Sequence, residues 1–288
     1  MIIIFAIALL LLIVLYFLSK NKYFEYIEPL NENEFRLKKL LPIGFYLLDR
    51  INYKYSSKYD RNLLNKTAEL NGGVYAHYYL RVHWANKITF ELLLLALLLF
   101  INAAMGKTDM EFLGFSLSVL VITAFATDKE LDNKVNKRRI SMQLDFPDFL
   151  NTLTLLINAG MTVSGAWTRI AADTKKNTPL FVELRNVMAE ITNGKSEIAA
   201  YEEFAKRCRL PEVTKFVSVI TQNLKKGNSE LVDILKFQSK ECWEMRKHAA
   251  KRIGEEASSK ALFPMMLMFL AVVLVVVTPA IIGLIGSV

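Results

Sequence analysis

Four stretches of the chain are long, hydrophobic and almost free of charge. Each carries at most one charged residue, and they cover residues 1–18, 88–104, 110–127 and 261–286. A helix that crosses a membrane needs about 20 consecutive apolar residues. The pattern therefore predicts a transmembrane anchor over residues 1–18, a transmembrane hairpin over residues 88–127 and a C-terminal transmembrane helix over residues 261–286.

The first stretch could instead be a secretory signal peptide that is cleaved. Such peptides carry positive charge before the apolar core and small residues at a cleavage site after it. Here no Lys or Arg precedes the apolar run, and the residues after Leu18 read SKNKYFEY. We therefore favour a retained anchor.

The two remaining regions have the pattern of amphipathic helices. Apolar residues recur at helical spacing, Gly, Pro and Asn interrupt them, and no segment alternates as a half-buried strand does. We expect an all-α, polytopic membrane protein with a helical segment over residues 19–87 and a six-helix bundle over residues 128–260. The six helices are expected to begin near Pro147, Thr162, Pro179, Ser196, Pro211 and Ser229.

The ends of two of these helices are informative. The first helix is expected to span about Pro147 to Asn158 and to end at Gly160, because glycine suits the backbone at a helix C-terminus. No break separates the sixth helix from the last span, so the two are expected to form one rod with bends at Gly254 and Pro264.

Lys and Arg are concentrated in the two polar regions. Residues 20–87 contain 12 of them, residues 129–260 contain 23, and Lys107 is the remaining one. Positively charged loops stay on the cytoplasmic side of a membrane. With four spans, both regions would lie in the cytosol at the inner membrane and both termini outside. The two regions would still share one side if the hairpin did not cross.

The net charge of +8 does not by itself indicate a nucleic-acid partner. The basic clusters flank predicted spans, at Lys137–Arg139 and Arg246–Arg252. Basic residues in that position orient spans and attract anionic lipid headgroups. We therefore expect membrane lipids, and no nucleic acid, among the partners.

The sequence carries little sign of catalytic chemistry. It contains none of the common phosphate-binding, metalloprotease, serine-hydrolase or EF-hand motifs. His77, His83 and His248 are scattered, and we interpret them as surface or interfacial residues. Cys208 and Cys242 lack CxxC spacing and are interpreted as reduced packing residues. We expect no enzyme activity, no cofactor and no metal.

Several charged residues are candidates for a contact with a partner. Glu255 and Glu256 lie about one turn before the last span. They could form a solvated face in which they pair with Arg252 or Lys260. Alternatively, they contact a partner at the cytoplasmic surface, together with Arg246. Asp148 suits the first turn of the helix that we expect at Pro147. Trp167 is typical of a core.

Two separated blocks resemble a known domain. The segment LDFPDFLNTLTLLINAGMTVSGAWTRIA, with Pro147 and Gly160, resembles the opening of the type II secretion system F domain. The segment from KKGNSELVDILKF to SSKALFPMM resembles its end. The matching positions there are Gly227, Leu231, Leu235, Arg246, the run Glu255–Ala257 and Pro264. The likeness covers residues 144–282.

The resemblance implies a membrane platform protein of a pilus or secretion machine. Such a protein would contact a cytosolic secretion ATPase and pass its motion to pilin subunits. One copy of the domain, in place of a tandem pair, resembles the Tad (Flp) pilus branch and implies a complex with itself or with a related platform protein. A membrane-anchored scaffold or sensor is the alternative, and a transporter is disfavoured because the spans lack ionisable residues other than Glu91 and Glu111 near their ends.

Overall fold

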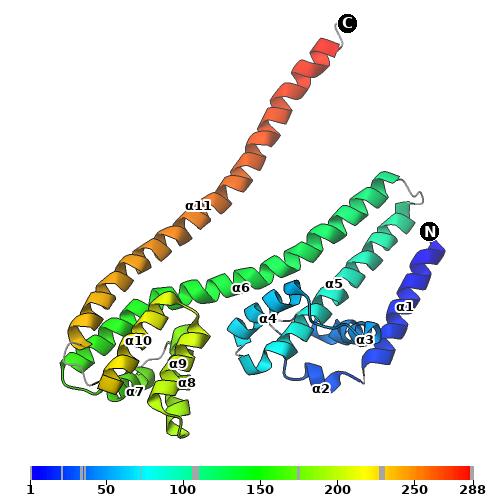
Figure 1. Ribbon diagram of the computed structural model, residues 1–288. Helices are drawn as coiled ribbons and strands as arrows, with labels where there is room; N and C mark the ends of the chain where they lie inside the picture. Colours follow the sequence, from blue (N-terminus) through cyan, green and yellow to red (C-terminus); the bar gives the residue numbers. More distant parts are fainter. Residues whose placement is uncertain are drawn as a thin grey trace. The chain divides into compact units, whose positions relative to one another are not determined.

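The computed structural model describes residues 2–20, 22–32, 35, 37–71, 73–105, 110–173, 176–226 and 231–285. Every regular element among these residues is a helix (Figure 1), which confirms the all-α prediction. Internal contacts divide the chain into two compact units, residues 1–138 and residues 139–288. Helix α6 (Met110–Asn158) begins in the first unit and ends in the second.

The first unit combines long apolar helices with shorter helices that pack against them. Its elements are α1 (Ile2–Lys20), α2 (Phe24–Ile27), a 3₁₀ turn (Lys38–Leu40), α3 (Leu41–Ile51), α4 (Lys58–Asn71), a second 3₁₀ turn (Gly73–Tyr75), α5 (Ala76–Met105) and the first part of α6. Helices α1 and α5 pack against each other, and the rings of Phe5 and Phe100 lie 5.2 Å apart. Helix α3 packs against both.

Helices α3 and α5 come unusually close at Gly44. A Cβ atom at this position would lie 2.2 Å from the backbone oxygen of Ala85 and 2.7 Å from Oγ1 of Thr89. Only glycine leaves room for the neighbouring backbone there. The core that forms around this contact consists of Tyr23, Ile27, Leu30, Leu41, Phe45, Leu48, Val82 and Ala85.

The second unit is the helical bundle. It contains the end of α6 together with α7 (Val163–Asp173), α8 (Pro179–Thr192), α9 (Glu197–Cys208), α10 (Pro211–Lys226) and α11 (Leu231–Ile285). Four of the expected helix starts, at Thr162, Pro179, Ser196 and Pro211, agree with these bounds within one residue. Ser229 lies outside the described residues.

The expected helix start at Pro147 is wrong. Pro147 lies inside the continuous helix α6, which already began at Met110. A proline in a helix interior removes one backbone hydrogen bond and costs about 3 kcal/mol. Burial of Phe146, Phe149 and Leu150, each at most 2 % exposed, outweighs that cost, because a buried side chain of this size contributes about 1.5–3 kcal/mol.

Trp167 is the centre of the bundle core. It is fully buried, and its ring lies 4.7 Å from that of Tyr201, 5.2 Å from that of Phe204 and 5.1 Å from that of Phe149. Its indole nitrogen donates a hydrogen bond to the backbone oxygen of Leu184. The interpretation of Trp167 as a core residue is confirmed.

Helix α11 changes its surroundings along its length. Leu231, Leu235, Gln238, Cys242 and Ala249 are buried against the bundle, and every residue from 250 to 279 is exposed. At 1.5 Å per residue, the exposed polar segment 250–260 covers about 16 Å before the apolar segment begins. The prediction that the last bundle helix and the last span form one helix is confirmed.

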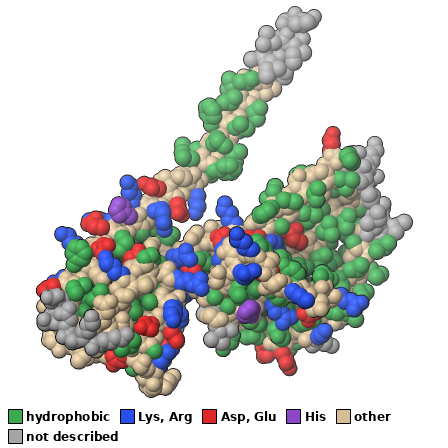
Figure 2. Space-filling model, in the orientation of Figure 1, with side chains coloured by type: hydrophobic (Ala, Val, Ile, Leu, Met, Phe, Trp, Pro, Cys, Tyr) green, Lys and Arg blue, Asp and Glu red, His purple; other side chains and the backbone are tan. Residues whose placement is uncertain are grey.

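Three helices are long and apolar enough to cross a membrane. They are α5, α6 and α11, and α1 contains a shorter apolar stretch over Phe5–Lys20. The space-filling view shows hydrophobic side chains covering the surface of the apolar part of α11 (Figure 2). A large exposed apolar surface of this kind is expected where lipid is the solvent.

Candidate functional site

Helix α11 is joined to α6 by Arg246. Its Nη1 atom lies 2.5 Å from Oδ1 of Asp148, and its guanidinium lies over the ring of Trp243, 4.8 Å from the ring centre. Lys176 approaches the same carboxylate at 3.4 Å. Arg246, which we expected at a partner contact, therefore also joins two helices of its own bundle. Asp148 belongs to the interior of α6, so its interpretation as a residue of a first turn is wrong.

Glu255 and Glu256 both lie on the exposed segment of α11 between the bundle and the apolar part. Glu255 is paired with Lys251 at 3.8 Å, and both side chains are more than half exposed. Exposed pairs of this kind contribute little to stability, with a median of about 0–1 kcal/mol. These two carboxylates are therefore accessible to a partner, and the contact itself stays a prediction.

Gly160 ends α6 in a left-handed turn. Its φ is +95°, its N–H donates to the backbone oxygen of Ile157, and the next N–H, of Met161, donates to that of Leu156. This pair of bonds is the Schellman motif, which satisfies the last carbonyl groups of a helix. The expected role of Gly160 is confirmed. Gly194 has φ +92° and ends α8 in the same way.

The remaining expected motif positions give a mixed result. Pro264 lies in the interior of α11 with an exposed side chain, at the start of the apolar part. Gly227 lies outside the described residues. The structure therefore places Pro147 and Arg246 in the same bundle. Glu255, Glu256 and Pro264 lie further along α11, in its exposed segment 250–279.

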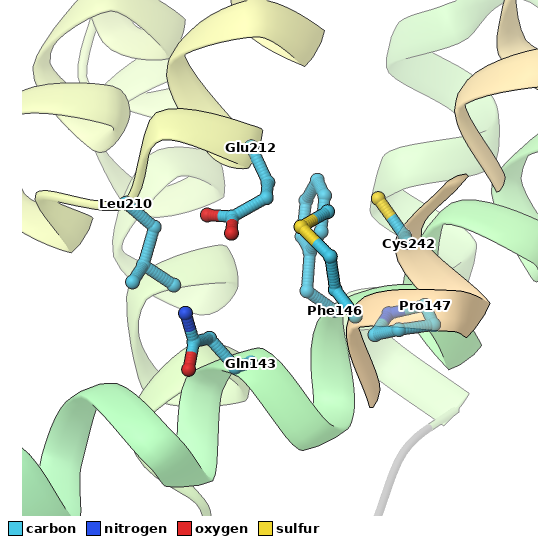
Figure 3. Close-up of a pocket in the computed structure, with 7 residues that line it drawn as sticks. Gln143, Phe146, Pro147, Leu210, Glu212 and Cys242 are labelled. Atoms are coloured by element: carbon cyan, nitrogen blue, oxygen red, sulfur yellow. The ribbon is translucent and has the colours of Figure 1, made fainter. Parts of the chain in front are cut away.

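A pocket lies where α6, α10 and α11 meet (Figure 3). It is small and is lined by Gln143, Phe146, Pro147, Leu210, Glu212, Cys242 and Met245. A neighbouring pocket between α10 and α11 shares Glu212, Cys242 and Met245 with it, holds about 160 Å³ and is also lined by Pro211, Lys215, Gln238 and Glu241. The sequence did not indicate this pocket, because its walls come from three separate segments.

Cys242 lies in the wall of this pocket. Burial, aided by the nearby carboxylates of Glu212 and Glu241, raises the pKa of its thiol to about 12. The thiol therefore stays protonated at neutral pH and is a poor nucleophile. Cys208 is also buried, and neither cysteine forms a disulfide. Both belong to the hydrophobic core of the bundle, which confirms their interpretation as packing residues.

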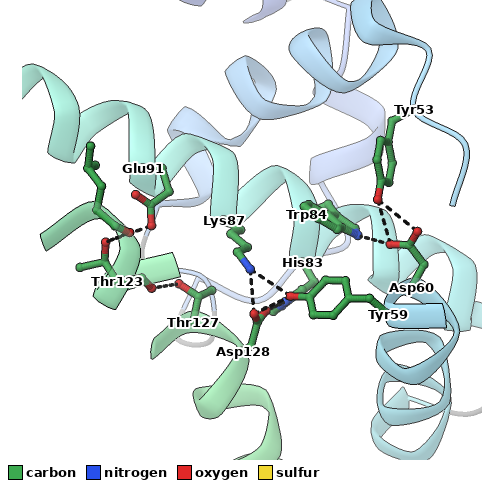
Figure 4. A network of polar contacts seen from close by, with 11 residues as sticks. Tyr53, Tyr59, Asp60, His83, Trp84, Lys87, Glu91, Thr123, Thr127 and Asp128 are labelled. Carbon is green, nitrogen blue, oxygen red and sulfur yellow. Dashed lines mark hydrogen bonds and ion pairs between the residues drawn. The ribbon is translucent and has the colours of Figure 1, made fainter. Parts of the chain in front are cut away.

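The first unit contains a fully buried carboxylate that sequence reasoning missed (Figure 4). Asp60 accepts hydrogen bonds from the hydroxyl of Tyr53, the indole nitrogen of Trp84 and both the N–H and the hydroxyl of Ser57. The N–H of Asp60 in turn donates to the Ser57 hydroxyl. This reciprocal pattern is a capping box at the start of α4, and the sequence Ser57-x-x-Asp60 was the signal that could have revealed it.

A second polar cluster joins α4, α5 and α6 near the start of the apolar hairpin (Figure 4). Asp128 of α6 is 2.7 Å from Nζ of Lys87 and 3.2 Å from Nε2 of His83, and it accepts a hydrogen bond from Tyr59. Of the two interpretations of His83, as a surface or an interfacial residue, the first is wrong, because its side chain is only 11 % exposed and contacts Asp128. One α-helical turn after Lys87, Glu91 accepts a hydrogen bond from Thr123 of α6.

These clusters have the composition of structural networks. Within the part of the chain that the structure describes, no group of three or more His, Cys, Asp or Glu side chains could hold a metal ion. Each of the carboxylates of Asp60, Glu91 and Asp128 is directed at a donor from a neighbouring helix. The arrangement can fix helices and present charged surfaces.

Comparison with known proteins identifies the second unit. Residues 149–279 match the family described as type II secretion system (T2SS), protein F. Searches of curated proteins and of solved structures found no significant match. The matched residues run from the last turns of α6 through α7–α10 and into the apolar part of α11, within the limits expected from the resemblance. Residues 149–279 of this chain are therefore a type II secretion F domain.

Proposed function

We propose that this protein is the inner-membrane platform of a Tad-type pilus machine, and that it couples a cytosolic secretion ATPase to the assembly of pilin subunits. The F domain supports the broader assignment to the platform proteins of secretion and type IV pilus machines, which generally contact a secretion ATPase and are generally not enzymes. The Tad branch and the ATPase contact are proposals that rest on the single domain copy and on the geometry of α11.

The observation that carries the proposal is the continuity of α11. One helix contains the residues buried in the bundle, the exposed segment 250–260 and the apolar part. A continuous helix can transmit displacement or rotation between its ends, because a long helix curves only gently where its backbone hydrogen bonds are intact. A partner that moves the bundle would therefore move the helix in the membrane.

The proposed topology has four spans, with the bundle in the cytosol. The apolar segment 261–285 of α11 covers about 37 Å, which exceeds the roughly 30 Å of a bilayer core. The contact between Phe5 and Phe100 supports an anchor at α1 that runs beside the apolar part of α5. The charge bias toward residues 20–87 and 129–260 supports the cytosolic location of both polar regions.

The experiment measures co-purification with the secretion ATPase of the same machine. The wild-type protein in mild detergent is expected to retain the ATPase. A variant with Glu255→Ala and Glu256→Ala is expected to lose most of it, because the exposed carboxylates are available to a basic surface on the partner. The matched control carries Glu202→Ala and Glu244→Ala, two exposed carboxylates elsewhere in the second unit, and is expected to bind normally.

The outcomes distinguish a failure of the proposed contact residues from a failure of the proposed coupling to an ATPase. Equal loss in both double variants would contradict a specific role for Glu255 and Glu256. Absence of ATPase from the folded, membrane-inserted wild-type protein, also in the presence of a related platform protein, would contradict the coupling function.

A further inference from the structure

The pocket between α10 and α11 contains two buried acceptors that receive no hydrogen bond from the protein. Gln238 is only 4 % exposed, and its Oε1 atom has no partner. Oε2 of Glu212 is likewise buried without a partner. Figure 3 shows the Glu212 carboxylate turned inward, on the side of Leu210 and Gln143. Buried acceptors are nearly always paired with a donor, because leaving one unpaired is unfavourable, so two unpaired acceptors in one pocket lining indicate a missing group.

The missing group has to be a hydrogen-bond donor. Both unsatisfied atoms are acceptors, and the one lysine in the lining, Lys215, is already paired with Glu241 at 2.6 Å. Two carboxylates against one ammonium leave the lining with a net negative charge. A cation that carries N–H donors satisfies both the charge and the acceptors, since charge-assisted hydrogen bonds are the strong ones.

The walls of the pocket add a second requirement. Pro211, Cys242 and Met245 give it an apolar lining beside the acceptors of Glu212 and Gln238. Lysine and arginine combine an apolar stem with a cationic head, and they bury the stem along apolar surface. The rim residues Pro211, Lys215 and Glu241 are exposed, so a peptide backbone can pass over the opening.

We propose that this pocket binds a lysine or arginine side chain of a partner protein. The stem lies against Pro211 and Met245, and the cationic head donates hydrogen bonds to Glu212 and Gln238. The site lies within the second unit and does not include Glu255 or Glu256. The inference does not depend on the proposed ATPase contact, because it is tested with peptides alone.

The experiment follows the methyl group of Met245 by NMR. The full-length protein is labelled with ¹³C at its methionine methyl groups and placed in lipid nanodiscs, and Met245→Leu assigns the signal. The probes are acetyl-Gly-Arg-Gly-amide and acetyl-Gly-Lys-Gly-amide. The first control probe replaces arginine by citrulline, which has a similar shape without the charge. The second is free 1,4-diaminobutane.

At least one of the two basic peptides is expected to shift the Met245 signal in a saturable way. Glu212→Gln is expected to weaken its binding at least about tenfold, because a hydrogen bond to a charged group is lost. The matched variant Glu202→Gln, on the exposed face of α9, is expected to bind as the wild type does. Lys215→Gln removes the competing ammonium and is expected to tighten binding by up to about fivefold.

Each other outcome overturns the proposal. No saturable shift with either peptide would mean that the acceptors are satisfied by solvent. Equal binding of the citrulline peptide would remove the requirement for a cation. Binding of diaminobutane alone would assign the pocket to a free amine and not to a protein side chain. A change in the signal of the core residue Met142 would show that Glu212→Gln perturbs the fold. In that case the test is Lys215→Gln, and failure of this variant to tighten peptide binding would overturn the proposal.

Discussion

In residues 1–138 the carboxylates of Asp60 and Asp128 link helices in addition to an apolar core, whereas the core of residues 139–288 is centred on a cluster of aromatic rings. Asp60 and Asp128 each collect donors from neighbouring helices in the first unit. In the second unit Trp167 packs against the rings of Phe149, Tyr201, Phe204 and Phe216. Arg207 pairs with the buried Glu183 and with the partly exposed Glu190.

This difference indicates which helices are fixed to one another and which part of α11 is free of such contacts. Hydrogen bonds to a buried carboxylate have one good geometry, so α4, α5 and α6 are fixed to one another where the apolar hairpin begins. In the second unit, α11 is buried only as far as Ala249, and among the described residues that follow, 250–279 are exposed. The first unit is therefore cross-linked by polar contacts between its helices, whereas α11 extends beyond the core of its own unit.

The largest effect is expected from Trp167→Ala. Removing a fully buried indole costs about 3–5 kcal/mol. Hydrogen exchange measured by mass spectrometry in detergent should increase throughout α7–α10 and remain unchanged in α3–α5. Trp243→Ala is the control, because Trp243 is 40 % exposed and its loss should have a much smaller effect. Equal loss of protection in both units would contradict the separation of the two cores.

A slightly smaller effect, confined to the other unit, is expected from Asp60→Ala. The change leaves the indole nitrogen of Trp84 and the hydroxyl of Tyr53 without an acceptor and removes the capping box, at a cost of about 3 kcal/mol. The same exchange measurement should show α4 and α5 losing protection. Asp132→Ala, which removes only a half-exposed partner of Lys66, should cost less than about 1 kcal/mol.

The smallest effects compare two glycines. Gly160→Ala places a side chain at φ +95° and should lower stability by about 1 kcal/mol. Gly254→Ala, inside α11 where no atom lies within 4 Å of the new Cβ, should raise local helix stability by a similar amount. Thermal unfolding in detergent should therefore shift in opposite directions. Shifts of the same sign would contradict the assigned roles.

Local signals in the sequence predicted most of the second unit. Proline at the first turn, Ser196 as a side-chain cap and Gly160 after the last turn act within a few residues of their own position, so they can be read from the chain alone. The error at Pro147 arose from the same rule. Proline favours a first turn, and the packing of Phe146 and Phe149 that overrides this preference comes from distant segments.

Contacts between distant segments could not be predicted. The pair formed by Asp148 and Arg246 joins residues 98 positions apart, and the pocket acceptors Glu212 and Gln238 meet only after folding. In the sequence Gly44 is only a break in a run of apolar residues. Its role is to let the backbone of Ala85, from another helix, come close, and this is visible only in the structure. The capping box at Ser57 and Asp60 is different, because its spacing was visible in the sequence and was overlooked.

The central claim, that α11 acts as a continuous lever, is tested most directly by changing its stiffness without changing its length. Replacing Ala257, Ser258 and Ser259 by three glycines lowers helix stability by about 3 kcal/mol relative to three alanines at the same positions. The measurement is the amount of assembled filament recovered from the surface of cells that carry either variant. The account predicts normal assembly with alanines and loss of assembly with glycines, while membrane insertion and ATPase binding stay intact. Equal assembly by both variants would contradict it.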